Sequence, residues 1–433
     1  MLHQIKSLQD VVDWGMCVGC GACSAACPRH AVTLLDHPAI GIRPSFAAGC
    51  AECNACLSFC PGPAVDGGLA VQQPSRTAAE HEFGPALEIW EGYAADPEIR
   101  FRASSGGLLT ALSLYCLEVE NMKFVSHIGM DASSPWRNRT VQSRTRKELL
   151  SRTGSRYAPA SPCDGLNSIE ESDGPCVFIG KPCDAAAVSK LRQERPALDR
   201  KLGLVLTFFC AGTPSTQGTL DLLKLLDVSP ADVDGLHYRG EGWPGRFRAA
   251  KKDGGVPSSL SYKESWSRLT SYRPMRCNLC PDGLGRVADI ACGDAWEQFE
   301  QNGDHGRSIV LVRTERGRRI LQGARAAGYV DLQPVTSAAV LAAQENLLQR
   351  RREIFGRVLA LRMFGIPAPR FVNFSLFHSW IRQPLGIQLR TVLGTIRRVF
   401  RRRLWRKQPL QIPTGSLATK APSLDSEQLP LAR

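Results

Sequence analysis

The chain has 433 residues and a net charge of +13, and 16 of its residues are cysteine. This length exceeds that of a single ferredoxin and allows at least one large domain with a sizeable core. No run of about 18 apolar residues is present, which excludes an ordinary membrane-spanning helix, and no apolar segment of the secretory type follows the N-terminus. Cysteines without a secretory signal indicate a reducing compartment and metal-bound thiolates, so we expect a cytoplasmic protein.

Two cysteine runs of the same form, Cys-x2-Cys-x2-Cys-x3-Cys-Pro, begin at Cys17 and Cys50. This is the spacing of bacterial ferredoxins, in which the fourth cysteine of each run ligates the cluster of the other run. A zinc site more often uses two separated cysteine pairs, and disulfides require an oxidising compartment. The runs therefore predict a two-cluster ferredoxin-like domain over residues 1–75. We expect one 4Fe-4S cluster on Cys17, Cys20, Cys23 and Cys60, and a second on Cys50, Cys53, Cys56 and Cys27.

Residues 62–85 are rich in Gly, Pro, Gln and Ser and are predicted to form a linker. In the body over residues 85–344, strand, turn and helix follow one another twice. This order indicates a parallel or mixed sheet covered by helices, so the fold class is α/β, and α+β overall. Strands are expected at 124–129, 176–180, 202–210, 245–253 and 309–312, and helices at 106–117, 185–195 and 216–226, the first capped by Ser104 or Ser105.

Four further cysteines occupy positions where ligands collect. Cys183 and Cys210 follow two of the predicted strands, and Cys277 and Cys280 form a Cys-x2-Cys pair. Ligands of open α/β sheets lie beyond the carboxyl ends of the strands, so these four thiolates could hold a third 4Fe-4S cluster. Alternatively, the first two are small buried apolar residues and the pair is a zinc half-site or a loop. We interpret the remaining cysteines as structural: Cys116, Cys163, Cys176 and Cys292.

Five motifs occur in order along the body. Together they resemble the beta subunit family of coenzyme F420 hydrogenases and dehydrogenases, over roughly residues 85–340, and a ferredoxin unit in front is a common fusion in that family. The motifs are Ser104-Ser-Gly-Gly107, Gly180-Lys-Pro-Cys183, Phe209-Cys-Ala-Gly-Thr-Pro-Ser215, Tyr238-Arg-Gly-Glu-Gly-Trp-Pro-Gly245, and Cys277-x2-Cys280 with Ala288-Asp-Ile290 and Gly293-Asp-Ala-Trp296.

The resemblance implies a bound FAD beside the third cluster, with a two-electron carrier or substrate docking on the flavin. The turn Ser105, Gly106, Gly107 would present backbone N–H groups to the pyrophosphate at a helix N-terminus, although simple tight packing is the alternative for a Gly-Gly turn. The turn Gly180, Lys181, Pro182 would add a cation. Trp243 would cover the flavin or the substrate, and Asp294 and Trp296 either line the same site or cap and pack a helix.

Two other features carry less chemistry. Residues 240–245 fit the pattern G-x-G-x-x-G, but that fingerprint must lead into a helix, and the following residues have a strand pattern, so we reject a nicotinamide site of this type. His127 and His237 lie beside predicted strands and are interpreted as structural. No catalytic acid or base is named.

The positive charge is concentrated near the C-terminus. Residues 345–407 carry 15 basic and 2 acidic side chains, whereas residues 1–344 carry 37 of each. Basic helices are expected over 345–407, interrupted at 367–369, and residues 408–433 are expected to be disordered. The segment 397–407 interleaves arginine with apolar residues and has three interpretations: a membrane-surface anchor, a docking site for an acidic partner, or a solvated helix face. Nucleic acid is not an expected partner.

The leading functional hypothesis is an FAD and iron–sulfur oxidoreductase. It would pass electrons between a two-electron carrier or organic substrate and ferredoxin-type clusters, with coenzyme F420 or a redox partner protein such as ferredoxin as the partner. A basic tail would suit work beside the inner membrane face, for example in surface-polysaccharide assembly. The alternatives are a non-catalytic electron-transfer subunit of a larger redox complex, which would hold no flavin, and a structural zinc protein.

Overall fold

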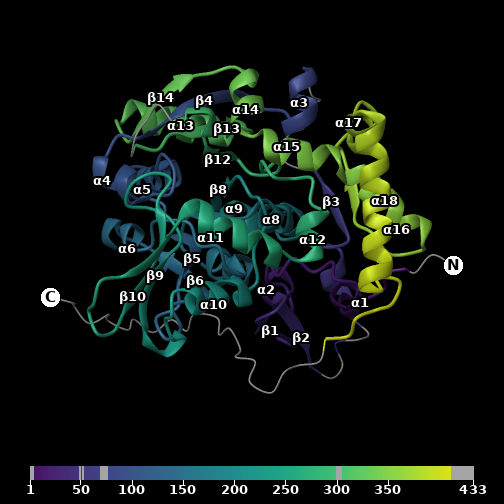
Figure 1. Cartoon of the computed structure of the whole chain (residues 1–433). Coiled ribbons are helices and arrows are strands. Elements are labelled where there is room, and N and C mark those ends of the chain that lie inside the picture. The colour runs from purple at the N-terminus through teal and green to yellow at the C-terminus, as the bar shows by residue number, and fades with distance from the viewer. Residues whose placement is uncertain (1–3, 48–49, 51–52, 69–76, 299–304, 411–433) are drawn as a thin grey trace.

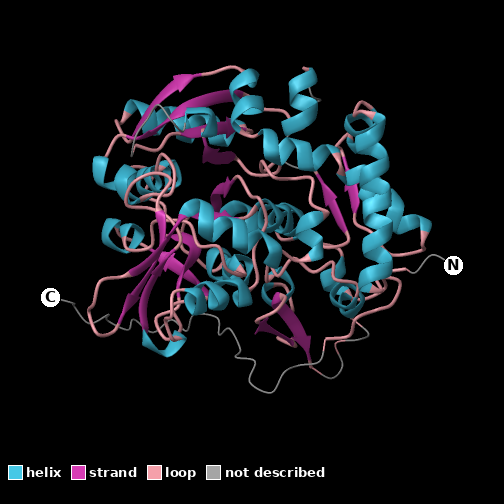
Figure 2. Ribbon diagram, in the orientation of Figure 1, coloured by secondary structure: helices cyan, strands magenta, loops and turns pink. Residues whose placement is uncertain are grey.

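The computed structural model describes residues 4–47, 50, 53–68, 77–298 and 305–410. Figure 1 shows the N-terminal unit, in purple, packed against the central helices α8 (Pro182–Glu194) and α12 (Met275–Asn278) and beside the yellow C-terminal helices. Figure 2 shows the central sheet enclosed by helices. Within the described residues, no helix is long and apolar enough to cross a membrane.

The N-terminal unit consists of short elements around the cysteine loops. The helix α1 (Leu8–Asp13) begins with a capping box, because Ser7 accepts from the Asp10 amide while the Asp10 carboxylate accepts from the Ser7 amide. Strands β1 and β2 form an antiparallel hairpin. The remaining elements of the unit are α2 (Ala22–Ala25), β1 (Val32–His37), β2 (Gly41–Phe46), the 3-10 turn η1 (Ala55–Leu57) and β3 (Ala64–Asp66).

An eight-stranded mixed sheet forms the centre of the body, with the order β14-β4-β13-β12-β8-β7-β5-β6. The central strands β12, β8, β7 and β5 run parallel, and the other pairings are antiparallel. The α/β prediction is therefore confirmed. The strands are β4 (Glu88–Ala94), β5 (Val125–Met130), β6 (Asn138–Ser143), β7 (Cys176–Gly180), β8 (Leu202–Phe208), β12 (Ile290–Asp294), β13 (Ser308–Val312) and β14 (Val330–Pro334).

Both faces of this sheet are buried. Val177 and Leu204 point into one core with the helices α5 and α13, and Phe178 and Val205 point into the other with α8. The covering elements are α4 (Pro97–Arg102), α5 (Leu108–Glu118), α6 (Arg146–Leu150), η2 (Pro162–Gly165), α7 (Leu166–Glu170), α8 (Pro182–Glu194), α9 (Pro196–Lys201), α10 (Thr216–Leu225), η3 (Pro230–Asp232), α11 (Tyr262–Leu269), η4 (Thr270–Tyr272), α12 (Met275–Asn278), η5 (Trp296–Gln298), α13 (Glu315–Ala326) and α14 (Ser337–Ala343).

The helix α5 begins later than the sequence predicts. Its N-cap is Gly107, which has a left-handed backbone with φ 79° and no side-chain cap, rather than Ser104 or Ser105. A glycine is required there because other residues are strained at positive φ. The two serines instead hydrogen-bond to neighbouring loops.

A second, antiparallel sheet lies at the lower left of Figure 1 and has the order β11-β10-β9. Its strands are β9 (Val233–His237), β10 (Arg246–Lys251) and β11 (Ser258–Ser261). The loop 240–245 leads into β10 and not into a helix, as the strand pattern of the following residues predicts.

The C-terminal segment returns to the N-terminal unit. Strand β15 (Arg370–Val372) pairs in parallel with β3, and both belong to segments for which no strand is expected from the sequence. The helices of this segment, which the sequence does predict, are α15 (Glu345–Arg352), α16 (Ile354–Met363), α17 (Leu376–Ile381) and α18 (Leu385–Arg402).

The linker prediction for residues 62–85 is wrong in part, since β3 and the helix α3 (Ala78–Phe83) lie within it. Residues 69–76 of that linker and residues 411–433 of the expected disordered tail lie outside the described part of the chain.

Candidate functional site

One edge of the central sheet gathers most of the chemistry of the body. The parallel strands β7, β8 and β12 end there, at Gly180, Phe208 and Asp294. The antiparallel strand β13 begins at the same edge, because Ser308 pairs with Asp294 on one side and with Gly92 of β4 on the other. We call this the carboxyl edge. Adjacent strands lie roughly 5 Å apart, so groups on neighbouring strand ends are close.

In the N-terminal unit, the structure brings Cys17, Cys20, Cys23 and Cys60 together. Burial, and then the neighbouring thiols of Cys20, Cys17 and Cys60, raise the pKa of Cys23 well above its usual value. The pKa of Cys60 is raised by burial and by Cys20 and Cys17. Such mutual effects require close sulfurs.

Cys27, Cys50, Cys53 and Cys56 form a second group. The pKa of Cys56 is raised to about 11 by burial, followed by the thiols of Cys27, Cys50 and Cys53. Cys27 is therefore grouped with the second run, although it belongs to the first in sequence. The two groups adjoin, because the Cys56 thiol lies 3.9 Å from the carbonyl oxygen of Cys23.

The carboxyl edge carries the third group. Cys183 lies in the first turn of α8, Cys210 follows β8, and Cys277 and Cys280 flank the end of α12. Burial, and then Cys277 and Cys280, raise the pKa of Cys210 to about 12. The pKa of Cys183 is raised by burial and by Asp184, with further effects of Cys210 and Cys280.

The loop after Cys210 approaches α12 very closely. Gly212 has φ 113°, and a Cβ there would lie 3.3 Å from the Cβ of Cys277. Only glycine permits both the backbone angle and the contact. Three segments that are far apart in sequence thus bring four thiols to one place. Within the described residues, no group of three or more Cys, His, Asp or Glu side chains has the arrangement needed to hold a single metal ion.

A pocket connects the N-terminal unit to the carboxyl edge. Cys17 and Arg43 of the unit line it together with Lys181 and Cys277 of the body. A cysteine of the first group and one of the third therefore face a common space.

Lys181 and Asp184 form a buried ion pair beside this pocket. The Lys181 ammonium lies 2.8 Å from the Asp184 carboxylate and donates to the carbonyl of Ala160 at 3.0 Å. Both residues act electrostatically on the thiols of Cys20 and Cys183, so the pair lies between the first and third groups. Lys181 thus has other partners than the phosphate that the sequence suggests for it.

Two cations of the body hold the N-terminal unit in place. The buried Arg276 donates to the carbonyls of Pro61 and Gly62 at 3.1 Å each. Lys190 donates to the carbonyls of Cys60 and Ala64 at 3.0 and 2.8 Å. The segment that carries Cys60 is therefore fixed to the helices α8 and α12.

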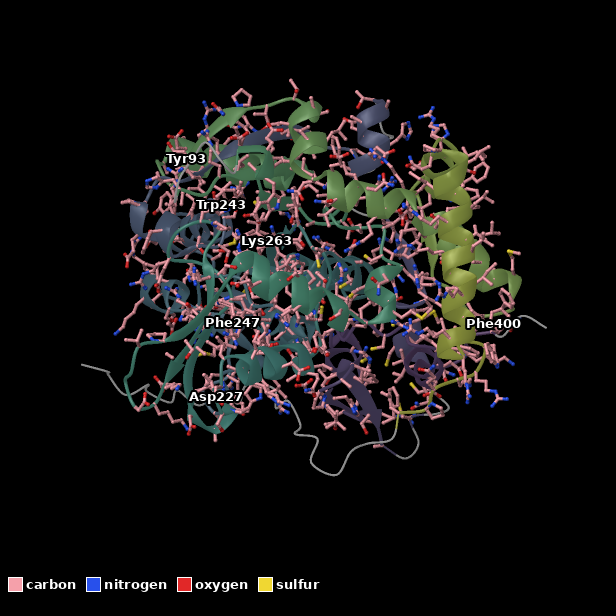
Figure 3. All side chains as sticks on the ribbon, viewed as in Figure 1. Tyr93, Asp227, Trp243, Phe247, Lys263 and Phe400 are labelled. Carbon is pink, nitrogen blue, oxygen red and sulfur yellow. The ribbon has the colours of Figure 1, made fainter. Side chains whose placement is uncertain are left out.

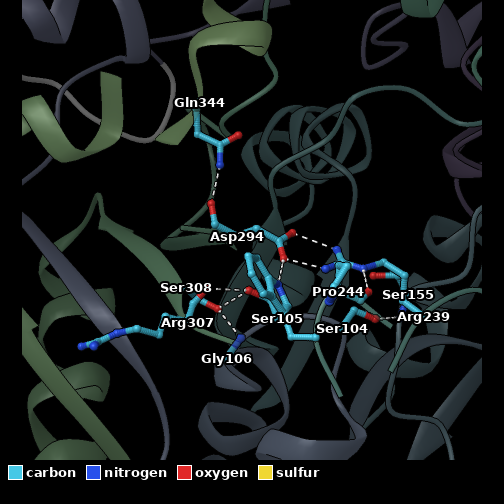
Figure 4. Close-up of polar contacts among 11 residues, drawn as sticks. Ser104, Ser105, Gly106, Ser155, Arg239, Pro244, Asp294, Arg307, Ser308 and Gln344 are labelled. Carbon is cyan, nitrogen blue, oxygen red and sulfur yellow. Dashed lines mark hydrogen bonds and ion pairs between the residues drawn. The ribbon is translucent and has the colours of Figure 1, made fainter. Parts of the chain in front are cut away.

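On the other half of the carboxyl edge, the Ser105–Gly107 turn packs against β13. The Ser105 hydroxyl lies 2.7 Å from the Ser308 hydroxyl and donates to the Arg307 carbonyl at 3.1 Å, and the Gly106 amide donates to the Ser308 hydroxyl at 2.9 Å (Figure 4). The Gly106 amide, expected to face a pyrophosphate, thus already has a partner. The N-terminus of α5 behind it has no side-chain cap.

Asp294 is the centre of a polar network next to this turn. Its carboxylate accepts two hydrogen bonds from Arg239, at 2.7 and 2.9 Å, and one from the Trp243 indole at 2.7 Å. Gln344 donates to the Asp294 backbone carbonyl at 2.5 Å (Figure 4). Arg239 is almost fully buried, so the bidentate pair is a strong and directional contact.

Aromatic rings surround Arg239. The ring of Trp296 stacks on Tyr262 with centroids 5.4 Å apart, and Trp243 lies 5.3 Å from Trp296. The Arg239 guanidinium lies 4.8 Å from the Tyr262 ring. A Cβ at Gly306 would lie 2.6 Å from the Ser105 carbonyl and 2.9 Å from the Trp243 ring, so this aromatic cluster adjoins the Ser105 turn.

Comparison with known proteins identifies the family of this architecture. Residues 89–166 and 175–338 match the N-terminal and C-terminal family models of the coenzyme F420 hydrogenase/dehydrogenase beta subunit. The chain belongs to this family. Residues 13–65 match a 4Fe-4S dicluster domain, which supports iron–sulfur clusters in the N-terminal unit.

Individual relatives agree with this family. The beta subunit of an F420-dependent formate dehydrogenase of Methanococcus maripaludis is 28% identical over 56% of this chain and 60% of its own length. The beta subunit of a coenzyme F420 hydrogenase of Methanococcus voltae is 23% identical over 66% of this chain and 99% of its own length. A chain of the F420-reducing [NiFe] hydrogenase complex of Methanosarcina barkeri shares the fold, with a TM-score of 0.50 and 22% identity over 64% of this chain and 94% of that chain.

The predicted cofactor residues of this beta-subunit family member fall into two groups. Ser105, Gly106, Gly107, Trp243 and Asp294 lie around the network at β4, β13 and β12. Gly180, Lys181 and Pro182 instead lie at the end of β7, beside Cys183.

Several residues of the network are not predicted from the sequence. They are Arg239, Tyr262, Ser308, Arg307 and Gln344. Only Arg239 carried a signal, as the second residue of the Tyr238-Arg-Gly motif.

Of the residues interpreted as structural, His127 and the four cysteines are buried, whereas His237 is exposed. The His127 ring lies 2.8 Å from the Ser143 hydroxyl, and burial followed by Arg152 lowers its pKa to about 3. Cys163 contacts the first cysteine group, because its amide donates to the Cys20 carbonyl at 3.0 Å. Cys116 and Cys292 lie inside the sheet core that includes α5 and α13.

Proposed function

We propose that this chain is an iron–sulfur flavoprotein oxidoreductase, in which FAD at the carboxyl edge exchanges electrons with 4Fe-4S clusters. The observation that carries the proposal is the order of sites along one path. The Asp294 network lies beside the third cysteine group, and Cys17 and Cys277 line a common pocket. A chain of one-electron carriers can follow that path.

We assign the cysteines to three clusters on the basis of their grouping. Four thiolates per cluster complete the ligation of a 4Fe-4S unit. The proposed ligand sets are Cys17, Cys20, Cys23 and Cys60, then Cys27, Cys50, Cys53 and Cys56, and finally Cys183, Cys210, Cys277 and Cys280.

The residues near Ser105 fit a dinucleotide. The uncapped N-terminus of α5 favours an anion. Arg100 and Arg307 stack on the Tyr93 ring at 3.5 and 5.7 Å, and Arg100 donates to the Gly306 carbonyl at 3.0 Å, so two cations adjoin the Ser105 turn. Trp243 and Trp296 supply flat apolar surfaces for an aromatic ring. FAD, when bound, would accept electrons as a pair and pass them on singly.

The partner at the flavin would be coenzyme F420 or an organic substrate, and the partner at the clusters would be a ferredoxin or another subunit. Both relatives described above carry F420 in their names. A role in surface-polysaccharide assembly stays a prediction from the basic tail.

Metal and flavin analysis of anaerobically purified protein tests the proposal. We expect about twelve irons, about twelve sulfides and about one FAD per chain. The variant Cys277→Ser/Cys280→Ser should lose about four irons. The matched control Cys292→Ser, which removes a buried thiol outside all three groups, should lose none.

The other functions give different results. About eight irons without flavin in the wild type would contradict the flavoenzyme and support an electron-transfer subunit. Zinc without iron would contradict both.

A further inference from the structure

The helix α18 packs with its polar side chains inward. Gln388, Thr391 and Thr395 are each less than a tenth exposed. Gln388 donates to the carbonyls of Ile381 and Gln383, and the two threonine hydroxyls donate to carbonyls one turn back along the helix. These groups are therefore satisfied without a partner outside the segment.

The inward face leaves no room for larger side chains. A Cβ at Gly356 of α16 would lie 2.7 Å from the Trp380 indole nitrogen and 3.0 Å from the Thr391 methyl group. The two helices are thus held at close approach by small residues, and the leucines of α18 cannot turn inward.

Three leucines and a phenylalanine of α18 face solvent instead, although Val399 of the same helix is fully buried. Leu385 is 75% exposed, and Leu389 and Leu393 are 61% exposed each. They are spaced four residues apart, so they follow one side of the helix, and Phe400 continues this line at 55% exposure. An ordinary surface helix has the opposite arrangement.

Neighbouring helices extend this surface. Phe364, the residue that follows α16, packs edge-on against Phe400 with ring centroids 5.4 Å apart. Of the 14 large apolar side chains that are exposed in the described residues, nine lie between positions 359 and 400, so they are concentrated and not scattered. We call these nine the apolar ridge: Leu359, Met363, Phe364, Phe377, Ile381, Leu385, Leu389, Leu393 and Phe400.

Cations flank the apolar ridge. Residues 376–407 contain nine arginine and lysine residues and no aspartate or glutamate. At 100° per residue, Arg397 and Arg401 lie on the side of α18 next to the exposed leucines, and both are exposed. An occupant of this surface must therefore be apolar at its centre and negatively charged at its margin.

We propose that this face binds the surface of an anionic lipid bilayer. A bilayer offers both properties over a wide area, because the leucines and phenylalanines can enter the acyl boundary while arginines reach the phosphates. The structure has no helix that could cross a membrane in its described part, so the contact lies on the surface. The inference does not depend on the flavin.

The position of this face suits such a contact. The helix α18 lies at the outer edge of the molecule (Figure 1), and Phe400 lies on the opposite side of the view from Trp243 and Tyr93 (Figure 3). A docked molecule would therefore leave the Asp294 network open to its partners. The sequence alone pointed only to residues 397–407, whereas the ridge begins well before them.

Flotation of the full chain with vesicles tests the proposal. We expect binding to vesicles of equal parts phosphatidylglycerol and phosphatidylcholine, and at least tenfold weaker binding to phosphatidylcholine alone. Leu389→Ser/Leu393→Ser should weaken binding about tenfold, and Arg397→Gln/Arg401→Gln about thirtyfold at low salt. High salt should weaken wild-type binding but change the arginine variant little.

Matched controls use exposed residues elsewhere. Leu225→Ser/Val256→Ser removes two apolar side chains that are 48% and 93% exposed. Arg139→Gln/Arg200→Gln removes two exposed arginines of the body. Both controls should bind as the wild type does, and the iron content of all four variants should be unchanged, which shows that they are folded.

Any one of the following outcomes would overturn the proposal. The wild type could bind both vesicle types alike or not at all, or the control variants could lose as much binding as the ridge variants. Binding that occurs only after removal of residues 411–433 would show that this segment covers the ridge. A dimer in solution that Leu389→Ser/Leu393→Ser dissociates would show that a second copy does. If the protein binds an acidic protein through Arg397 and does not bind vesicles, the partner of this surface is that protein and not a lipid bilayer.

Discussion

The N-terminal unit and the carboxyl edge both gather cysteines, but they do so in different ways. In the unit, eight cysteines come from two short runs between positions 17 and 60. At the edge, four cysteines come from three segments between positions 183 and 280, which only the fold of the sheet brings together. The first arrangement depends on local loops and the second on the ends of hydrogen-bonded strands.

This difference has consequences for stability. The loops of the N-terminal unit contain few regular elements, and its apolar residues Val11 and Trp14 belong to a core shared with α8. Clusters should therefore contribute much of its order, since metal binding supplies folding free energy where the apo site is not preformed. The edge rests on strands buried on both faces, and should keep its shape without a cluster.

Removal of iron should give the largest difference in stability between the N-terminal unit and the carboxyl edge. After chelation under reducing conditions, amide hydrogen exchange in residues 17–60 should accelerate on the order of 100-fold, because this region loses its metal contacts. Exchange in β7, β8 and β12 should stay within about twofold of the holo protein. Mass spectrometry of deuterated peptides measures both. Equal acceleration in the two regions would show that the sheet also depends on the metal.

Asp294→Asn should be the most harmful single change at the edge outside the cysteines. The Arg239 side chain is only 3% exposed, and the substitution leaves its guanidinium without a charged partner. Loss of one partner from a buried ion pair lowers the free energy of unfolding by roughly 3–5 kcal/mol. Urea unfolding measures the loss, and flavin content should fall with it. The control Asp234→Asn changes an exposed residue of β9 and should cost less than about 0.5 kcal/mol. If the Asp294→Asn protein is as stable as the wild type but contains no flavin, Asp294 contributes to flavin binding and not to stability.

Lys181 and Asp184 should tune the two proposed clusters on either side of them. Asp184→Asn removes a negative charge near Cys20 and Cys183 and should raise the reduction potentials of those clusters, by on the order of 60 mV for about 1.4 kcal/mol. Lys181→Met should lower them by a similar amount. Redox titration followed by electron paramagnetic resonance measures the shifts. The exposed control Asp253→Asn should shift neither potential, and a shift confined to one cluster would place the pair beside that cluster alone.

The sequence predicted β7, β8 and β13 well, but it did not predict β4, β12 or β14. β7 (Cys176–Gly180) and β8 (Leu202–Phe208) are continuous apolar runs, which is the pattern of strands buried on both faces. β4 contains two glutamates and a glycine, and β14 contains a proline and lies at the sheet edge, so their patterns are weak. β12 ends in Gly293-Asp294, which resembles a loop.

The site was predictable only where residues are close in sequence or belong to a recognised motif. The pairing of Arg239 with Asp294 joins residues 55 positions apart, and nothing local indicates it. The orientation of α18 was likewise not predictable, because its apolar periodicity favours the leucines as the buried face. The threonines and Gly356 reverse that choice through tertiary contact.

The smallest expected effect concerns the far end of the N-terminal unit. Lys407 lies 2.5 Å from Asp10 of α1, and the Gln408 amide donates to the Asp13 carbonyl, so the end of the described chain is fastened to this unit. Burial alone would raise the pKa of Asp10, but the hydrogen bonds from Lys407 and the Lys6 amide lower it below its usual value.

Since the folded-state pKa of Asp10 is depressed, the stability that this contact contributes is present above the unfolded value of about 3.9 and is lost as the pH falls through the folded value. Because Lys407 is 47% exposed, Lys407→Met should lower the free energy of unfolding, measured with urea, by only about 0.5 kcal/mol. Between about pH 5 and 8 the cost should be constant, because Asp10 stays ionised there, and high salt should reduce it. The neighbouring control Arg406→Met should cost nothing measurable, and an equal loss in both variants would assign the effect to general charge instead of the contact with Asp10.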